Sequence, residues 1–231
     1  MAARNIVVTG TSISASVWHG AYIGSDPFTA EDTFTNYGVG GSGIGGTSLT
    51  HSITYAATGG RKQQVINAYV PGVLNILIVE AGANDYYNNA DTSGNLALLE
   101  TLLLYCDDLR AVGYKVLLNT QLPQDGNTSI GLAHNASRLY IDPVVRAAVG
   151  SRIDACIDWA NDPVLGPDSA AQGANTVDTD CFADYVHLTA EGAWRASLVA
   201  RAAINSIESL STQRFTLSAG ITNDELVVAI L

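Results

Sequence analysis

Cysteine is scarce in this sequence, and its three copies form no pattern. Cys106 lies in an apolar helical pattern, Cys156 in a strand-like run and Cys181 in an acidic loop, and their spacing matches no metal-ligand motif. The sequence therefore indicates neither a disulfide framework nor a metal site. Three buried free thiols are expected, and a bond between Cys156 and Cys181 is the remaining alternative.

Basic residues and long apolar runs are also few. Lysine and arginine number 11 against 22 aspartates and glutamates, which gives a formal net charge of -11 at pH 7. A surface of this sign repels phosphate backbones, so no nucleic acid partner is expected. The first residues lead straight into a short strand-like run, and no stretch approaches membrane-spanning length. We therefore expect a soluble cytoplasmic protein with no membrane partner, either free or within a larger assembly.

What the chain does have is hydrophobic content, 47% of its 231 residues, which suits one large core. Strand-like apolar runs recur at 6–9, 33–37, 73–80, 115–120 and 153–159. Helical patterns fall between several of them, at 94–112, at 134–149 with an interruption at Asp142-Pro143, and at 190–210 with Thr189 as N-cap. Continuous apolar strands that alternate with helices predict a three-layer α/β/α sandwich with a mostly parallel sheet, over residues 1–211.

The end of the chain has a different pattern. Apolar runs at 214–218 and 225–231 are separated by a turn-like segment, which predicts a β-hairpin within a C-terminal extension, 212–231. An exposed hairpin this apolar invites pairing with another chain, so it is a candidate contact in a homo-oligomer. The alternative, in which the hairpin folds back onto its own domain, is equally open.

The first strand-like run ends at Gly10, and Ser12 follows just past its carboxyl end, where open parallel sheets place their ligands. A serine needs a base to act as a nucleophile. Asp184-Tyr-Val-His187 stands immediately ahead of the last predicted helix. A carboxylate three residues before a histidine can fix the ring tautomer and leave Nε2 to take the serine proton. Taken alone, the motif favours the alternative, in which His187 is an ordinary residue at the approach to a helix.

Two further segments contain candidate oxyanion donors. Asn84 follows the strand at 73–80, and its side-chain NH2 can stabilise a negative oxygen without adding a titratable group, although an ordinary turn is the alternative. A glycine-rich turn at 36–43 lets backbone N–H groups approach a ligand closely. The same turn matches the G-x-G-x-x-G spacing. A dinucleotide site is only weakly indicated, because a poor helix start follows and no acidic residue lies about 20 positions on.

The four segments occur in the order Ser, Gly, Asn, Asp-x-x-His, each at a predicted strand end or in the final loop. In this order the chain resembles the SGNH (GDSL-type) hydrolases, over the whole predicted α/β core. The resemblance implies Ser12 as nucleophile, His187 as base and Asp184 as the residue that orients the base. It also implies an oxyanion hole made by the Ser12 N–H, the Gly41 N–H and the Asn84 side chain. A flavodoxin-like strand order is implied as well, with neither metal nor cofactor.

One position departs from the pattern of that family. Its first block usually reads Gly-Asp-Ser, whereas this chain has Gly10-Thr11-Ser12. The nucleophile itself is kept. The missing carboxylate is expected to change how the loop that carries Ser12 is braced.

Aromatic and histidine side chains complete the list of candidates. Four aromatic residues flank the proposed site and either line a substrate pocket or simply pack beside strands: Trp18, Tyr37, Tyr86 and Tyr87. The remaining histidines have no carboxylate at a suitable spacing and are expected at surface or loop positions: His19, His51 and His134.

These features together predict a serine ester hydrolase that works through an acyl-enzyme. The loops around the site are polar and glycine-rich, and no long apolar lid segment is evident. This favours short acyl chains such as acetyl on a polar or carbohydrate alcohol, while thioesters and lipids remain open. The alternative is a non-catalytic binding or assembly module on a hydrolase scaffold, with the C-terminal hairpin as its docking element.

Overall fold

The computed structural model describes most of the chain. The described residues are 4–15, 32–45, 51–56, 58–86, 92–125, 127–168, 170–171, 181–184 and 186–220, with side chains described up to residue 207. The expected positions of Trp18, His19 and Tyr87 lie outside these residues.

Five strands form a single parallel sheet: β1 (Arg4–Gly10), β2 (Thr33–Gly38), β3 (Leu74–Glu80), β4 (Lys115–Asn119) and β5 (Ala155–Ile157). Their order is β2-β1-β3-β4-β5, and every neighbouring pair is parallel. This is the flavodoxin-like, doubly wound order, whose switch point lies between β1 and β3. The predicted fold class, a parallel sheet within an α/β sandwich, is confirmed.

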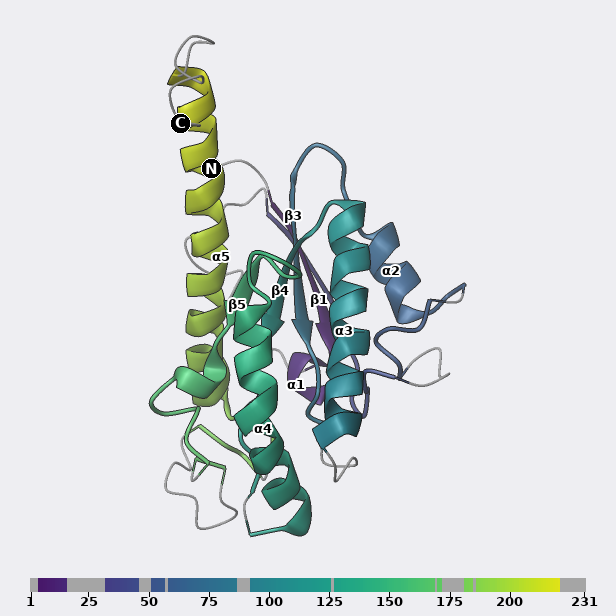
Figure 1. The fold of residues 1–231 in the computed structure, drawn as a ribbon, viewed down its shortest axis with the longest axis vertical. Helices are drawn as coiled ribbons and strands as arrows, with labels where there is room; N and C mark the ends of the chain where they lie inside the picture. Colours follow the sequence, from purple (N-terminus) through teal and green to yellow (C-terminus); the bar gives the residue numbers. More distant parts are fainter. Residues whose placement is uncertain are drawn as a thin grey trace.

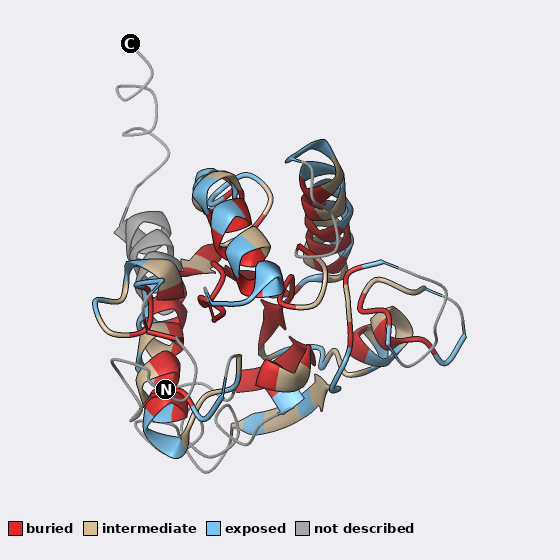
Figure 2. Cartoon of the chain, turned by 90° about the horizontal axis from the view of Figure 1, so that it is seen from below, coloured by how far each residue is buried: buried red, intermediate tan, exposed pale blue. Residues whose placement is uncertain are grey.

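Helices cover both faces of the sheet (Figure 1): α1 (Ser12–Ala15), α2 (Arg61–Asn67), α3 (Thr92–Val112), α4 (Ser129–Ala147) and α5 (Ala190–Gly220), with the short 3-10 helix η2 (Trp159–Asn161) after β5. Side chains that alternate along the strands face two separate cores. Val7 packs in the core beneath α2, α3 and α4, whereas Ile6 and Val8 pack in the core beneath α5. The buried sides of α3 and α4 turn inward and their exposed sides turn to solvent (Figure 2).

Helix α5 approaches the sheet through small side chains. Ala193, Ala196, Ala200 and Ala203 are buried on one side of the helix, where they contact the core formed by β4 and β5. At its start, the Thr189 hydroxyl accepts a hydrogen bond from the Gly192 N–H at 3.1 Å, so the predicted N-cap is confirmed. Further on, α5 extends past the end of the sheet (Figure 1).

Two predicted helix boundaries are wrong. Helix α4 begins at Ser129, capped by the Thr128 hydroxyl, rather than at His134, and it continues through Pro143 instead of being interrupted there. A proline removes only one helical N–H. Ile141 and Val145, on either side of it, are buried against the sheet, and this packing outweighs the lost hydrogen bond.

The first strand of the expected hairpin is also wrong. Residues 214–218 are helical, because α5 runs on to Gly220. The chain contains neither glycine nor proline from Ala193 to Ala219, so no residue of the usual helix-ending type occurs earlier. The expected domain boundary at 211/212 falls inside this helix, and the second strand, 225–231, lies outside the described residues. The proposed oligomer contact therefore stays a prediction.

The predictions for the cysteines and histidines are confirmed in part. All three cysteines are free thiols, so the alternative bond between Cys156 and Cys181 is wrong; Cys106 and Cys181 are buried and Cys156 is half-buried. His51 is exposed in a loop, as expected. His134 is fully buried in α4, where its Nε2 contacts the Leu122 carbonyl oxygen at 2.9 Å, so its expected surface position is wrong.

Neither a membrane span nor a metal site is found in the part of the chain that the structure describes. None of its helices is both long and apolar enough to cross a bilayer. Likewise, no three of its His, Cys, Asp or Glu side chains are grouped so that they could hold a metal ion.

Candidate active site

The candidate site lies at the carboxyl edge of the sheet. Ser12 follows β1 and opens α1, the glycine-rich loop (residues 39–44) follows β2, and Asn84 follows β3. Parallel strands bring these three ends together at one edge. The fourth segment, 184–187, reaches the same edge from the loop before α5.

Three side chains form a continuous hydrogen-bonded series. His187 Nε2 lies 3.0 Å from Ser12 Oγ, across 175 residues of sequence. His187 Nδ1 lies 2.7 Å from Asp184 Oδ2. The His187 and Asp184 side chains are each 48% exposed, and Ser12 is half-buried, so the series is open to solvent and to a substrate.

The turn that carries His187 is built by Asp184. Asp184 Oδ1 accepts hydrogen bonds from the Val186 N–H at 2.8 Å and from the His187 N–H at 2.6 Å. The Ala183 N–H donates to the His187 carbonyl oxygen at 2.8 Å and closes the turn. Partial burial alone would raise the pKa of Asp184, but the hydrogen bonds from the His187 N–H, the His187 ring and the Val186 N–H outweigh it and hold that pKa below its usual value.

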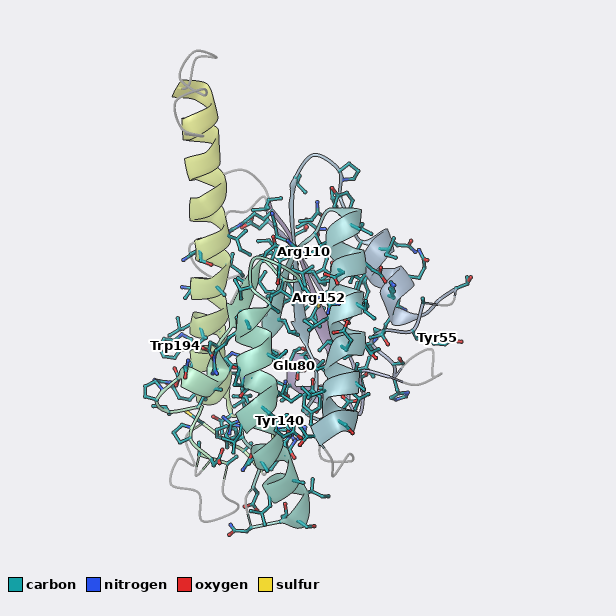
Figure 3. The ribbon with its side chains drawn as sticks, viewed as in Figure 1. Tyr55, Glu80, Arg110, Tyr140, Arg152 and Trp194 are labelled. Carbon is teal, nitrogen blue, oxygen red and sulfur yellow. The ribbon has the colours of Figure 1, made fainter. Side chains whose placement is uncertain are left out.

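Ser12 lies in the nucleophile loop, residues 10–14, which is held by hydrogen bonds to Glu80. The Thr11 N–H and hydroxyl donate to Glu80 Oε2 at 2.9 and 2.6 Å. The Ser14 N–H and hydroxyl contact the same oxygen at 3.3 and 3.2 Å. Glu80 lies in the interior of the molecule, beside α1 (Figure 3). The departure at Thr11 predicted a change in how this loop is braced. In the structure the bracing carboxylate belongs to Glu80, at the end of β3.

Sequence reasoning missed Glu80, although the sequence carries a signal for it. It is the one charged residue at the end of an otherwise uncharged strand, Leu74–Glu80, and it pairs in register with Gly10. A Cβ on Gly10 would lie 2.3 Å from the Glu80 carbonyl oxygen and 2.4 Å from Ser14 Oγ, so only glycine fits.

The glycine-rich loop is held next to Ser12 by residues that follow β3. Asn84 Nδ2 donates to the Ser42 carbonyl oxygen at 2.9 Å. The Ile44 N–H donates to Asp85 Oδ1 at 2.8 Å, and burial raises the pKa of Asp85 to about 6 despite that bond. Gly41 has a φ of 73°, in the left-handed region that favours glycine.

A buried arginine that sequence reasoning also missed joins the two loops. Arg61, on α2, is 2% exposed. Its Nη1 donates to the Gly10 carbonyl oxygen and its Nη2 to Ser42 Oγ, both at 3.2 Å. Burial lowers the pKa of this guanidinium. The end of β1 and the glycine-rich loop are therefore tied together by one side chain.

A narrow recess, too small to hold a water molecule, lies beside the sequence neighbours of Ser12 and His187. Ile13 and Val186, the neighbours of Ser12 and His187 in sequence, form part of its wall. The remaining wall mixes apolar and amide side chains: Ala83, Leu122, Pro123 and Trp159 with Asn119, Gln121 and Gln124, and with Glu80.

The aromatic candidates do not form this recess. Tyr86 is fully buried in the core beneath α2, α3 and α4, so its expected position in a substrate pocket is wrong and the packing alternative holds. Tyr37 is half-buried and packs against the same core.

No protein-family model matches this sequence, and no curated protein matches it. Solved structures do match. A lipolytic protein of the G-D-S-L family from Veillonella parvula DSM 2008 has a TM-score of 0.55 at 18% identity, over 84% of this chain and 93% of its own. A GDSL-like lipase from Bacteroides thetaiotaomicron VPI-5482 has 0.58 at 15% identity, over 89% and 88%. A protein described as an SGNH hydrolase from Slackia heliotrinireducens has 0.59 at 17% identity, over 87% and 99%.

These matches extend over most of each chain, although the identities are low. At these identities they show a shared fold. The resemblance that the motif order indicated is confirmed at the level of the fold: the chain has the fold of the SGNH (GDSL-type) hydrolases.

Proposed function

We propose that this chain is a serine ester hydrolase with Ser12 as nucleophile, His187 as base and Asp184 as the residue that orients the base. The observation that supports it most is the series from Ser12 Oγ to His187 Nε2 at 3.0 Å and from His187 Nδ1 to Asp184 Oδ2 at 2.7 Å. Both contacts are within the distance needed for proton transfer and for holding a ring tautomer.

In the proposed reaction, Ser12 Oγ attacks the ester carbonyl carbon while His187 Nε2 takes the hydroxyl proton. The C=O electrons move to the oxygen and form an oxyanion. When the carbonyl re-forms, the C–O bond to the alcohol breaks, and the alcohol leaves with the proton from Nε2. Water then attacks the acyl-enzyme with its proton taken by Nε2, and the acid leaves as Ser12 regains its proton.

The oxyanion needs donors that point to the position where charge develops. We propose the Ser12 N–H, the Gly41 N–H and the Asn84 side chain for this role. The proposal is supported by their shared position at the carboxyl edge of the sheet and by the hydrogen bond from Asn84 to Ser42, next to Gly41. Backbone and amide donors stabilise an anion without titrating.

The proposed nucleophile is tested by a Ser12→Ala variant assayed on p-nitrophenyl acetate. Removal of Oγ leaves no atom to form the acyl-enzyme, so kcat is expected to fall by on the order of 10³-fold or more. The wild-type protein is expected to be labelled by a fluorophosphonate, and the variant is not. Thr101→Ala, an exposed substitution in α3, is the control and keeps both properties. Hydrolysis by the Ser12→Ala variant at the wild-type rate would rule out this function.

We also propose that the substrates carry short acyl groups such as acetyl on a polar or carbohydrate alcohol. The polar, glycine-rich loops that follow β1 and β2, and the lack of a long apolar lid segment in the sequence, support this preference. In a p-nitrophenyl ester series from C2 to C12, kcat/KM is expected to be highest for C2 and to fall by on the order of tenfold or more by C8, because the polar loops offer added methylenes no apolar surface. A maximum at C8 or beyond would contradict the preference and leave ester hydrolysis itself standing.

A further inference from the structure

We propose that Glu80 is a positioning residue for Ser12, and that its buried carboxylate holds both flanks of the nucleophile loop in the geometry that the reaction needs. This inference rests on the proposed ester hydrolysis. It concerns a residue on a different strand from the nucleophile, which does not touch the reacting atoms.

The contacts of Glu80 are concentrated on one oxygen. Oε2 is within hydrogen-bond distance of four donors, two on Thr11 and two on Ser14, at 2.6 to 3.3 Å. These residues stand directly before Ser12 and two positions after it. The Thr11 hydroxyl also accepts from the Ile13 N–H at 3.3 Å, which extends the network inside the loop. Ser12 Oγ takes no part in this network and contacts His187 instead.

The loop has little room to move against Glu80. A Cβ on Gly10 would lie 2.9 Å from Glu80 Oε2, so backbone and carboxylate are already in close approach. On the other side, Arg61 donates to the Gly10 carbonyl oxygen. The nucleophile loop is thus held at its start by a guanidinium and across its turn by a carboxylate.

Burial of the Glu80 carboxyl is energetically unfavourable, which indicates a role beyond packing. The residue is 1% exposed, its Oε1 has no hydrogen-bond partner, and no basic side chain among the described residues forms an ion pair with it. Burial raises the pKa of Glu80, and the hydrogen bonds from Thr11 and Ser14 only partly oppose this. A buried carboxyl with an unpaired oxygen is expensive, and such groups occur preferentially at functional sites.

The benefit of this arrangement is precision. His187 and Ser12 come from segments 175 residues apart, so their 3.0 Å contact depends on each segment being fixed independently. Asp184 fixes the histidine turn, and Glu80 fixes the serine turn. A displacement of about 1 Å at a reacting atom can cost on the order of a hundredfold in rate.

Thr11 suits this carboxylate. Its hydroxyl provides the shortest hydrogen bond to Glu80, at 2.6 Å. An aspartate at position 11 would place a second carboxyl against the first one, and one of the two would have to be protonated. Residues 11 and 80 therefore act as a matched donor and acceptor, and they can be tested as a pair.

The test compares fluorophosphonate labelling rates and steady-state kinetics of Glu80→Leu, Glu80→Gln and Thr11→Asp. Glu80→Leu removes the acceptor that the four donors share, and labelling is expected to slow by on the order of a hundredfold, with kcat reduced and KM changed less than threefold. In Glu80→Gln the amide oxygen takes the place of Oε2 and the NH2 group that of the partnerless Oε1, so labelling is expected to be at least tenfold faster than in Glu80→Leu. Thr11→Asp is expected to slow labelling.

Asp154→Asn is the control away from the site. Asp154 accepts from the Val116 N–H at 2.9 Å, at the opposite edge of the sheet. This substitution removes a carboxylate without reaching the site, and wild-type labelling is expected. If the wild-type protein is not labelled, the proposed function fails. If it is labelled, and a folded Glu80→Leu is labelled equally fast, only the role of Glu80 is overturned. Should Glu80→Leu not fold, wild-type labelling by Thr11→Asp overturns it.

Discussion

Asp184 performs two tasks with one carboxylate. Oδ1 accepts the Val186 and His187 N–H groups and so shapes the turn, while Oδ2 contacts the imidazole at 2.7 Å. The ring is therefore oriented by the same side chain that fixes its own backbone. Because every atom involved lies within four residues, the Asp-x-x-His spacing predicts the pair from sequence alone.

Asn84 allows a prediction that separates transition-state stabilisation from substrate binding. If its amide stabilises the oxyanion as proposed, Asn84→Ala lowers kcat by on the order of a hundredfold and leaves KM nearly unchanged, because the charge on the oxygen develops only in the transition state. Steady-state kinetics on p-nitrophenyl acetate measure both parameters.

The control for this prediction must loosen the same loop without removing the donor. Thr54→Val does so, since the Thr54 hydroxyl donates to the Ile44 carbonyl oxygen at 2.6 Å, at the far end of the glycine-rich loop. Its kcat is expected to stay within threefold of wild type. A loss in Asn84→Ala that appears mainly in KM would assign Asn84 to holding the loop instead.

Other site residues could not be predicted from spacing. Glu80 faces Gly10 only because β1 and β3 pair in one register, and Arg61 reaches Gly10 only because α2 packs beneath that strand end. Both contacts depend on how the elements pack in the tertiary structure. The sequence does mark Glu80 as unusual, since a charge at the end of an uncharged strand needs a partner.

At the scale of the elements, the strands were the most predictable part of the chain. Each of the five strands overlaps the apolar run that predicted it. Strands buried on both faces are apolar throughout, which makes the runs continuous. The fifth run was predicted as 153–159, and pairing covers only Ala155–Ile157, because Trp159 begins the 3-10 helix η2. The order of the strands came from the family resemblance, because apolar runs carry no information on pairing.

Helices were less predictable, for reasons of length and packing. Helix α2 has seven residues and buries only Arg61 and Val65, so it leaves no periodic pattern to detect. The Asp142-Pro143 pair suggested an interruption in α4, but tertiary packing overrides that local signal. For α5, the change of apolar pattern after Leu210 suggested a strand where the helix continues. The apolar residues in that segment were recognised, but their helical periodicity was not.

At the scale of the whole molecule, the site depends on contacts between elements that are distant in sequence. Arg61 joins β1 to the glycine-rich loop, and Asn84 and Asp85 join that loop to the end of β3. Glu80 joins β3 to Thr11 and Ser14, on both sides of Ser12. The three strand ends are therefore joined by side-chain hydrogen bonds, and the site is expected to fold together with the core rather than after it.

Two buried groups on α4 give the stability of the molecule opposite dependences on pH. Burial lowers the pKa of His134 to about 4 and raises the pKa of Asp142 to about 6. As pH falls from 6.5 to 4, the unfolded chain binds a proton at His134 before the folded one, so stability is lost. As pH falls through 6, the folded chain binds a proton at Asp142 before the unfolded one, so stability is gained.

Two matched variants separate these contributions. His134→Gln can still donate to the Leu122 carbonyl oxygen, and Asp142→Asn can still accept from the Gln121 N–H. Between pH 7 and pH 5, His134→Gln is expected to gain roughly 2 kcal/mol of unfolding free energy relative to wild type, and Asp142→Asn to lose about 1 kcal/mol. Urea unfolding at the two pH values measures both. Because the expected shifts have opposite signs, a uniform loss of stability at low pH cannot produce them. Parallel pH profiles of the unfolding free energy for all three proteins would contradict the roles given to His134 and Asp142.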